Sequence, residues 1–326
     1  MLPLASIVIT SRNRREELAG AVASALAQKT DGVVEIIVID DGSTDGTSQM
    51  IAEKFPGVKL HRFESSAGLI VRRNHGARIA TAPIVFSIDD DACFSTETIV
   101  ADILAQFVLP AVGAVAIPFI DVHQDAGAVR QRPPGTSGDY AGPSYIGTAH
   151  ALRRDLFLRL GGYREALFHQ GEEGDYCLRM LAAGHVVRLG RSDPIHHFES
   201  PRRDFRRVDL YGRRNNILFG WHYAPPQTLP AYLAATTWNG LAHGFKVRRP
   251  WIMMQGLAKG YAAMWAQRKD RAPVPAAVYR LYRELVRRQA VPYAEIAARL
   301  SRERLGGTGP ERDGSLHLRL EGKSPP

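Results

Sequence analysis

The stretch IVFSIDDDA, residues 84–92, determines how the rest of this sequence is interpreted. An apolar run typical of a buried strand comes first, and Asp89, Asp90 and Asp91 follow it directly. Carboxylates this close repel one another, and each loses hydration if it is enclosed. Such a cluster is favourable either in open water, as a solvated acidic turn, or around a cation. At this point the sequence leaves both interpretations open.

Short apolar runs alternate with segments of helical periodicity through residues 1–200. This alternation is typical of an α/β fold whose sheet is mainly parallel. The segment 121–143 is rich in glycine and proline and is expected to be a long loop. We expect strands near residues 4–10, 34–39, 58–62, 84–88, 113–117 and 185–189, and helices after Arg14 and near 45–55, 69–80, 96–108, 152–160 and 172–183.

Composition argues against several classes of protein. Apolar residues make up 45% of the chain, and no apolar run approaches the roughly 18 to 20 residues that a transmembrane helix needs. The N-terminus leads straight into a strand-like segment without a secretory signal, so we expect a cytoplasmic protein. Cys93 and Cys177 form no CxxC motif, which argues against a disulfide framework and against a structural zinc site.

Charge is distributed unevenly along the chain. Residues 201–326 contain 23 Lys and Arg against 9 Asp and Glu, whereas residues 1–200 contain 19 against 24. We therefore predict an α/β domain at 1–200, a basic and mainly helical region at 201–305, and a disordered tail at 306–326. The basic region could face nucleic acid, anionic lipid or a phosphorylated substrate, and a solvated helix surface is an equal alternative. Nucleic acid is disfavoured because no recognised binding module accompanies the charge.

Polar residues follow three of the expected strands. Thr10 and Ser11 end the first strand, Asp40 and Asp41 end the second, and the three aspartates end the fourth. Open α/β sheets bind ligands beyond the carboxyl ends of their strands, and these groups suit a base, a ribose and a metal diphosphate. The alternative is that Asp and Ser are simply common turn residues.

Two familiar nucleotide-binding motifs are absent. The first turn, TSRNR at 10–14, has no glycine where GxGxxG would bring the backbone close to a pyrophosphate, and GxxxxGK[ST] does not occur. A bound diphosphate would therefore have to be held by a cation and by side chains.

From about Ser6 to His197 the sequence resembles the inverting family 2 glycosyltransferases. The resemblance implies the α/β GT-A fold at residues 1–200, a Rossmann-like mixed, mainly parallel sheet flanked by helices that binds a nucleotide sugar, with a helical C-terminal extension. Each matching string is moderately specific, and their order and spacing together are strongly so. The strings are IIVIDDGSTDGT at 36–47, GLIVRRNHGA at 68–77, FSIDDDA at 86–92, RRDLFLRLGGYRE at 153–165 and GEEGDYCLRMLAAG at 171–184.

The resemblance implies which residues contact the nucleotide. Thr10 and Asp41 would contact the base, and Asp89 would reach the ribose. Arg73 would support the nucleotide or its diphosphate, although it could equally be a surface residue of its helix. The remaining candidates for contact with the nucleotide are Asp40 and Asp90.

The resemblance also implies a divalent cation. Asp91 would bind Mg²⁺ or Mn²⁺, with Asp89 as a further ligand, because hard cations prefer oxygen and neutralise charge on a leaving diphosphate. Related enzymes place a metal-contacting histidine after the last strand of this region, where this chain has His196 and His197. His196 is our first choice for that ligand, and a purely structural histidine is the alternative.

A catalytic base is the second requirement, since a sugar hydroxyl attacks poorly unless its proton is accepted. Glu172 and Glu173 supply the candidate carboxylates, and Asp175 follows two residues later. The family usually has Glu-Asp at this point, so Glu173 takes the aspartate's place and is the preferred base. Acidic residues are also favoured at a helix N-terminus for electrostatic reasons alone, which is the competing explanation.

These residues predict a metal-dependent, inverting transfer of a hexosyl or deoxyhexosyl group from a nucleoside-diphosphate sugar to a hydroxyl acceptor. We expect a role in the synthesis of cell-surface polysaccharide or glycolipid. The alternative is a non-catalytic nucleotide- or polysaccharide-binding protein on the same scaffold, which the replacement of Asp by Glu at position 173 favours.

The start of the basic region suggests where an acceptor could be met. Six arginines lie between Arg202 and Arg214, beside Phe205 and Tyr211. We expect this arm to meet a phosphorylated or lipid-linked acceptor at the inner, anionic face of a membrane. Formation of a homodimer through the Trp-bearing helices is the alternative.

Overall fold

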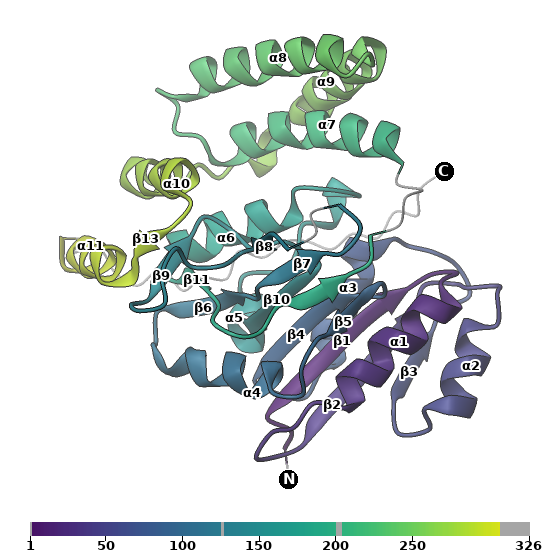
Figure 1. The fold of residues 1–326 in the computed structure, drawn as a ribbon. Coiled ribbons are helices and arrows are strands. Elements are labelled where there is room, and N and C mark those ends of the chain that lie inside the picture. The colour runs from purple at the N-terminus through teal and green to yellow at the C-terminus, as the bar shows by residue number, and fades with distance from the viewer. Residues whose placement is uncertain (1, 125–126, 200–203, 307–326) are drawn as a thin grey trace.

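The computed structural model of the protein describes residues 2–124, 127–199 and 204–306. A nine-stranded mixed sheet forms its centre, with the strand order β13, β9, β11, β6, β10, β4, β1, β2, β3. Helices flank this sheet, and a further group of helices from the C-terminal third lies beyond α6 (Figure 1). The predicted α/β fold with a helical C-terminal region is confirmed.

Four parallel strands make up the N-terminal half of the sheet. They are β4 (Ile84–Asp89), β1 (Ala5–Ser11), β2 (Val34–Asp40) and β3 (Lys59–Arg62). They are connected by α1 (Arg15–Leu26), α2 (Thr47–Lys54) and α3 (Leu69–Ile79), close to the predicted positions. Alternate residues of a strand face opposite sides, so Ile7 packs in the same core as Leu18 of α1, and Val8 packs with Ile70 of α3.

The other half of the sheet contains a strand that we did not predict. β10 (Ala149–Arg153) runs antiparallel between β4 and β6 (Val112–Ala116). The predicted helix at 152–160 is therefore too long, because its first residues extend β10 and α5 spans only Arg154–Arg159. Beyond β6 lie β11 (Val186–Leu189), β9 (Tyr140–Gly142) and β13 (Val291–Pro292). The helices α4 (Ile99–Leu104) and α6 (Glu172–Ala182) and the single turns η1 (Ala105–Val108) and η2 (Glu165–Leu167) complete this half.

A four-stranded second sheet lies beside the first. It contains β5 (Ala92–Phe94), β12 (Ile195–His197), β7 (Phe119–Asp121) and β8 (Val129–Arg130). Its register places His197 opposite Ala92 on one side and Asp121 on the other. Because β8 and β9 both fall within 121–143, the prediction of one long loop there is only partly right.

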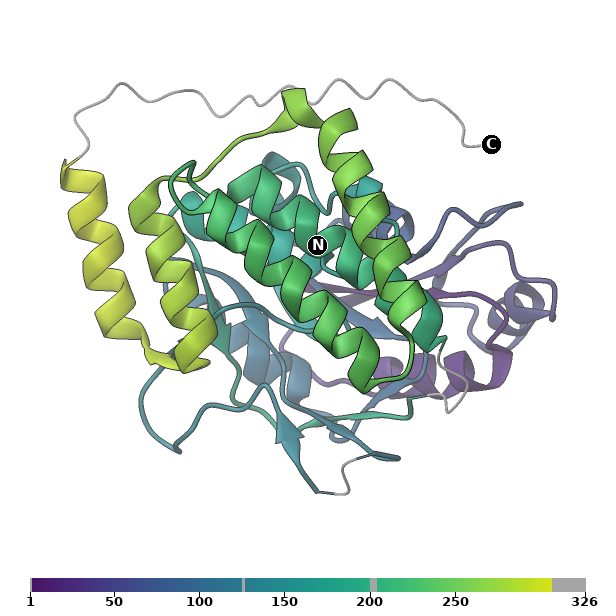
Figure 2. The ribbon, with the colours of Figure 1, turned by 90° about the horizontal axis from the view of Figure 1, so that it is seen from above.

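The C-terminal third is helical, as predicted. Figure 2 shows α8 (Leu229–Lys246) and α9 (Pro250–Ala266) crossing over the molecule near α7 (Phe205–Tyr223). The chain then passes through η3 (Arg268–Asp270), α10 (Ala276–Arg288) and α11 (Tyr293–Gly306). No helix in the described ranges is both long and apolar enough to cross a membrane.

The end of the chain returns to the main core. β13 pairs with β9, and Val278, Leu281 and Leu285 of α10 are buried in the core that also contains Ile7. The boundary that we drew at residue 200 therefore marks a change in sequence character, and its use as a domain boundary stays a prediction. Residues 307–326, most of the predicted tail, lie outside the described residues.

Candidate active site

The three polar strand ends meet at one edge of the sheet. Strand β1 lies between β4 and β2, and its register sets Thr10 beside Asp89 and Ser11 beside Asp40. The backbone of Asp41 continues this pairing by donating to the Ser11 carbonyl at 2.9 Å. The strand ends therefore converge as the sequence predicted.

Asp89, Asp91 and His197 form a group that could hold a metal ion. One ligand atom from each side chain lies within 4.8 Å of the others. His197 Nε2 is 3.3 Å from Asp91 Oδ1, and its Nδ1 is 3.7 Å from Asp121 Oδ2. Burial opposes the charged imidazole, but Asp91 raises the pKa of His197 above its ordinary value.

His197, and not His196, is the histidine that reaches these carboxylates. Successive side chains of a strand point to opposite faces, and the pairing of β12 with β5 and β7 sends His197 toward Asp91. His197 thus takes the position that we had preferred for His196, and its role as a metal ligand stays a prediction.

Arg14 joins the aspartate cluster from the loop that precedes α1. Its guanidinium lies 3.3 Å from Asp90 and also forms an ion pair with Asp91. Burial raises the pKa of Asp90 to about 7, whereas for Asp91 the effect of burial is outweighed by His197 and Arg14, which lower its pKa. We had not singled out Arg14, because nothing in the sequence places it against residues more than seventy positions away.

Arg73 connects the aspartate cluster to the candidate base. Its Nη2 donates to Asp89 Oδ1 at 2.5 Å and to the Gly147 carbonyl at 2.9 Å. Its Nη1 lies 3.6 Å from Glu172 and 3.9 Å from Glu173. Burial opposes its charge, but these carboxylates keep the pKa of Arg73 above its ordinary value. Arg73 is buried, so the alternative of a surface helix residue is excluded.

The second oxygen of Asp89 is also engaged. Thr148 Oγ1 donates to Asp89 Oδ2 at 2.9 Å. Thr148 directly precedes β10, the strand that the sequence analysis missed, and so its role was missed as well. Asp89 is thus held in place by Arg73 and Thr148, on opposite oxygens.

Glu172 and Glu173 lie in the first turn of α6. Burial raises the pKa of both carboxyl groups above the ordinary glutamate value, and for Glu172 the nearby Glu173 raises it further. The Glu172 side chain is 5% exposed, and its Oε2 has no hydrogen-bond partner among the described residues. Glu173 is 20% exposed and is therefore the more accessible of the two.

The two acidic residues at the end of β2 differ in their surroundings. Asp41 accepts hydrogen bonds from Ala67 N at 2.8 Å, Gly68 N at 3.0 Å and Arg72 Nε at 2.5 Å. Burial raises the pKa of Asp41, but its hydrogen bonds outweigh this effect and lower the pKa below the ordinary value. Asp40 is fully buried and accepts from Ser43 N at 2.8 Å and from Ser48. Asp40 therefore stabilises the turn, and the structure gives its carboxylate no route to a ligand.

Thr10 and Asp175 also differ in position. The Thr10 hydroxyl is buried at the end of β1 and has no hydrogen-bond partner among the described residues, so its contact with a ligand stays a prediction. Asp175 instead accepts hydrogen bonds from Arg164 at 3.2 Å, Arg179 at 2.7 Å and the Tyr223 hydroxyl at 2.5 Å. Asp175 therefore fixes α6 against α7 behind the candidate base.

Two solved structures with a similar architecture contain nucleotides, sugars and Mn²⁺. The mannosyltransferase PcManGT of Pyrobaculum calidifontis, in complex with GDP-Man and Mn²⁺, superposes with a TM-score of 0.54 at 20% identity, over 94% of this chain and 88% of that one. GalNAc-T7 with UDP, GalNAc and Mn²⁺ superposes with a TM-score of 0.54 at 17% identity, over 76% and 58%. The class of the protein is thus an α/β protein with the GT-A fold.

The sequence also matches a family model. Residues 6–161, slightly less than half of the chain, match the family described as Glycosyl transferase family 2. This part of the chain is therefore similar to that family, in agreement with the resemblance found in the sequence.

Characterised relatives are similar to part of the chain. The succinoglycan biosynthesis protein ExoU of Rhizobium meliloti is 32% identical over 199 residues, covering 55% of this chain and 57% of that protein. The human polypeptide N-acetylgalactosaminyltransferase 9 is 24% identical over 214 residues, covering 56% of this chain and 36% of that protein. The matched regions thus amount to little more than half of the first relative and about a third of the second.

Proposed function

We propose that the protein is a metal-dependent, inverting glycosyltransferase that moves a sugar from a nucleoside-diphosphate sugar to a hydroxyl acceptor. One observation carries this proposal: Asp89 joins two groups of side chains. Asp91 and His197 lie on one side of it, and Arg73 with Glu173 lies on the other. The first group offers ligands for a cation, and the second offers a carboxylate that can accept a proton.

Asp89, Asp91 and His197 fit a hard divalent cation. Carboxylate oxygens are the ligands that Mg²⁺ and Mn²⁺ prefer, and Mn²⁺ also accepts an imidazole nitrogen. The presence of Mn²⁺ in PcManGT and in GalNAc-T7 supports this choice. When bound, the ion would supply positive charge to the diphosphate that leaves.

Glu173 would act as the general base. The acceptor oxygen forms a bond to the anomeric carbon while the bond from that carbon to the diphosphate breaks, and the hydroxyl proton passes to Glu173. Because burial raises the pKa of Glu173 toward neutrality, its carboxylate is a better proton acceptor than an ordinary glutamate. Arg73 would orient this carboxylate and hold Asp89 toward the ribose. Thr10 and Asp41 would border the base of the nucleotide.

The acceptor is proposed to belong to a polysaccharide or a glycolipid. The name of ExoU, a succinoglycan biosynthesis protein, supports a polysaccharide.

A screen by thermal unfolding tests the donor site. Uridine, thymidine and guanosine diphosphates and their sugars are added with and without Mn²⁺, and any released nucleoside diphosphate is identified by mass spectrometry. We expect Mn²⁺-dependent protection that Asp91→Ala abolishes. Glu173→Ala should keep that protection and lose turnover. Wild-type turnover in either folded variant would remove that residue from the proposed site.

The same screen separates transfer from simple binding. If the wild-type protein is protected by a nucleoside diphosphate with Mn²⁺ but neither transfers nor hydrolyses any donor, a non-catalytic binding protein is the better description. The partly exposed Glu173 beside Arg73 favours the enzyme, because a binding protein needs no carboxylate with a raised pKa there.

We further propose that the outer surface of α8 and α9 contacts an anionic membrane. Trp238 is 73% exposed, Phe245 72%, Trp251 65% and Trp265 69%. They belong to apolar stripes at three- and four-residue spacing. The exposed apolar residues are Ala231, Ala235, Trp238, Ala242 and Phe245 on α8, and Trp251, Met254, Ala258, Ala262 and Trp265 on α9.

Charge favours lipid over a second copy of the chain. Residues 210–269 contain eight Lys and Arg and no Asp or Glu, but Arg214 is buried and Arg249 forms an ion pair with Asp209. The remaining six cations would repel those of a second copy, whereas anionic lipid would attract them. The arginine-rich arm contributes less than we expected, because Arg214 is buried and donates to the Ala166 carbonyl at 3.0 Å. Arg202 and Arg203 lie outside the described residues.

Sedimentation with vesicles tests this surface. Wild-type protein should sediment with phosphatidylglycerol-containing vesicles and less so with pure phosphatidylcholine or at high salt. Trp238→Ser combined with Trp251→Ser should lower the bound fraction, whereas Val108→Ser, at a site 75% exposed and remote in sequence, is the control. Equal binding of the double variant would contradict the proposal. A change of mass in solution without vesicles would point to self-association instead.

A further inference from the structure

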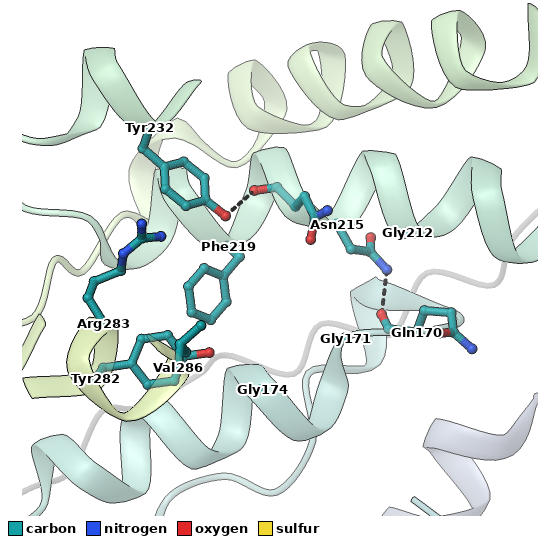
Figure 3. A pocket seen from close by; sticks show the side chains of 11 residues that line it. Gln170, Gly171, Gly174, Gly212, Asn215, Phe219, Tyr232, Tyr282, Arg283 and Val286 are labelled. Atoms are coloured by element: carbon teal, nitrogen blue, oxygen red, sulfur yellow. Dashed lines mark hydrogen bonds between the residues drawn. The ribbon is translucent and has the colours of Figure 1, made fainter. Parts of the chain in front are cut away.

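A pocket of about 380 Å³ lies between α6, α7, α8 and α10, outside the aspartate cluster. Figure 3 shows aromatic side chains around it, with Tyr232 from α8, Phe219 from α7 and Tyr282 from α10. Gly171 and Gly174, which bracket Glu172 and Glu173 in the sequence, also line it. The pocket therefore borders the helix turn that carries the candidate base.

Two glycines in the pocket wall, Gly174 and Gly212, leave space in the pocket, and close helix packing does not require glycine at either position. Gly174 and Gly212 both lie inside helices, where glycine is less favourable than alanine. A Cβ on Gly212 would meet no atom within 4 Å, and one on Gly174 would meet only the Tyr282 hydroxyl at 3.8 Å. By contrast, a Cβ on Gly220 or Gly256 would collide with a neighbouring helix at 2.2 or 2.6 Å. The two pocket glycines thus differ from the helical glycines that allow close helix packing.

The lining has the chemistry of a saccharide site. The Phe219 ring centroid lies 6.4 Å from that of Tyr232 and 5.6 Å from that of Tyr282, which gives an aromatic wall suited to the C–H face of a pyranose. No acidic residue lines the pocket, and Arg283 forms no ion pair with any side chain in the described ranges. An unpaired guanidinium beside a sugar ring suits a carboxylate or a phosphate on that sugar.

We propose that this pocket binds an anionic sugar unit of the acceptor, beside the turn of α6 that carries Glu173. The inference rests on the proposed transferase function and adds the acceptor class to it. The aromatic wall would hold the ring, and Arg283 would hold its carboxylate or phosphate. A neutral pyranose would bind more weakly, because it leaves Arg283 without a partner.

Saturation-transfer NMR with methyl glucoside, methyl glucuronide and glucose 6-phosphate tests the pocket. We expect the two anionic ligands to bind wild-type protein, and Gly212→Phe to abolish their signals while Gly212→Ala weakens them less. Arg283→Gln should weaken the anionic ligands roughly tenfold or more and leave methyl glucoside unchanged. Arg287→Gln, at an exposed arginine of the same helix that does not line the pocket, is the matched control. The ratio between glucuronide and phosphate signals distinguishes the two anions.

Protection by nucleoside diphosphate and Mn²⁺ is measured on the same samples, after circular dichroism has shown that each variant is folded. If saccharides fail to bind, or bind equally to wild type and Gly212→Phe, the pocket is not an acceptor site. This conclusion holds whether or not nucleoside diphosphate and Mn²⁺ protect the protein. If saccharides bind as expected but no nucleoside diphosphate does, the transferase proposal fails and a saccharide-binding pocket remains.

Discussion

Gly147 occupies the narrow space between Arg73 and Glu173, and replacing it with alanine tests the geometry of the site. A Cβ at this position would lie 2.5 Å from Arg73 Nη1 and 2.5 Å from Glu173 Oε1. Ordinary contacts of a Cβ begin near 3.4 Å, so the two side chains must retreat by roughly 1 Å. The backbone at Gly147 is not in the left-handed region, so alanine is otherwise tolerated.

The displacement has a calculable consequence. A misplacement of about 1 Å in a reacting group costs on the order of 10²-fold in rate, or roughly 2.7 kcal/mol in activation free energy. We expect Gly147→Ala to lower kcat for transfer, or for slow donor hydrolysis, by about that factor. Overpacking should lower the free energy of unfolding by about 1 to 3 kcal/mol, which leaves a folded protein to assay. Gly57→Ala, where a Cβ would meet no atom within 4 Å, is the control.

A double variant separates this explanation from general damage. Glu173→Asp shortens the side chain that collides with the new methyl group. The fold-loss of kcat in the double variant Gly147→Ala, Glu173→Asp should therefore be smaller than the product of the fold-losses in the two single variants. Wild-type kcat in Gly147→Ala, with circular dichroism unchanged, would refute the claim that Arg73 and Glu173 must stay at their observed separation.

Three further predictions concern metal binding, packing and pH. Asp91→Asn and His197→Ala should each weaken Mn²⁺ binding measured by calorimetry, whereas His196→Ala should leave it unchanged, and the opposite order would reinstate His196. Asp175→Ala should lower the free energy of unfolding, measured in urea, by about 3 to 5 kcal/mol, because it leaves Arg164 and Arg179 without their buried partner. Asp155→Ala is the control. Asp155 is 83% exposed and pairs with Arg154, so its loss should lower the free energy of unfolding by less than about 1 kcal/mol. Burial raises the folded-state pKa of Glu172 to about 8, compared with about 4.3 in the unfolded chain. The contribution of Glu172 to stability is therefore complete at acidic pH and is lost as the pH rises from about 4.3 through about 8. Glu172→Gln should flatten this decline of the unfolding temperature with pH, and an unchanged slope would contradict the raised pKa.

Much of the site could be predicted because it depends on short-range patterns. An apolar run followed by aspartate marks the carboxyl end of a parallel strand, and parallel strands bring those ends to one edge. Thr10, Asp41 and Asp89 were placed together by this reasoning alone, and the register between β1, β2 and β4 agrees with it.

The parts that could not be predicted depend on contacts distant in sequence. Whether His196 or His197 faces the aspartates is determined by the pairing of β12 with β5, about a hundred residues earlier. Thr148 was missed with β10, whose sequence AHALR is too short to separate a strand from the start of a helix. The return of β13 to pair with β9 spans some 150 residues, and Val291–Pro292 carries no strand pattern of its own.

The balance of charge explains why the three aspartates are not equivalent. Asp89 is held by Arg73, and Asp91 by Arg14 and His197, while Asp90 has a longer contact to Arg14 and a pKa raised by burial. Together with Asp121, Glu172 and Glu173, six carboxyl groups then lie around two guanidinium groups and one imidazole. A divalent cation bound at Asp89, Asp91 and His197 would reduce this excess, and the diphosphate of a donor would restore it. The site is therefore expected to bind the cation and the donor diphosphate together more strongly than either alone, and calorimetric titration of Mn²⁺ with and without nucleoside diphosphate measures that coupling directly.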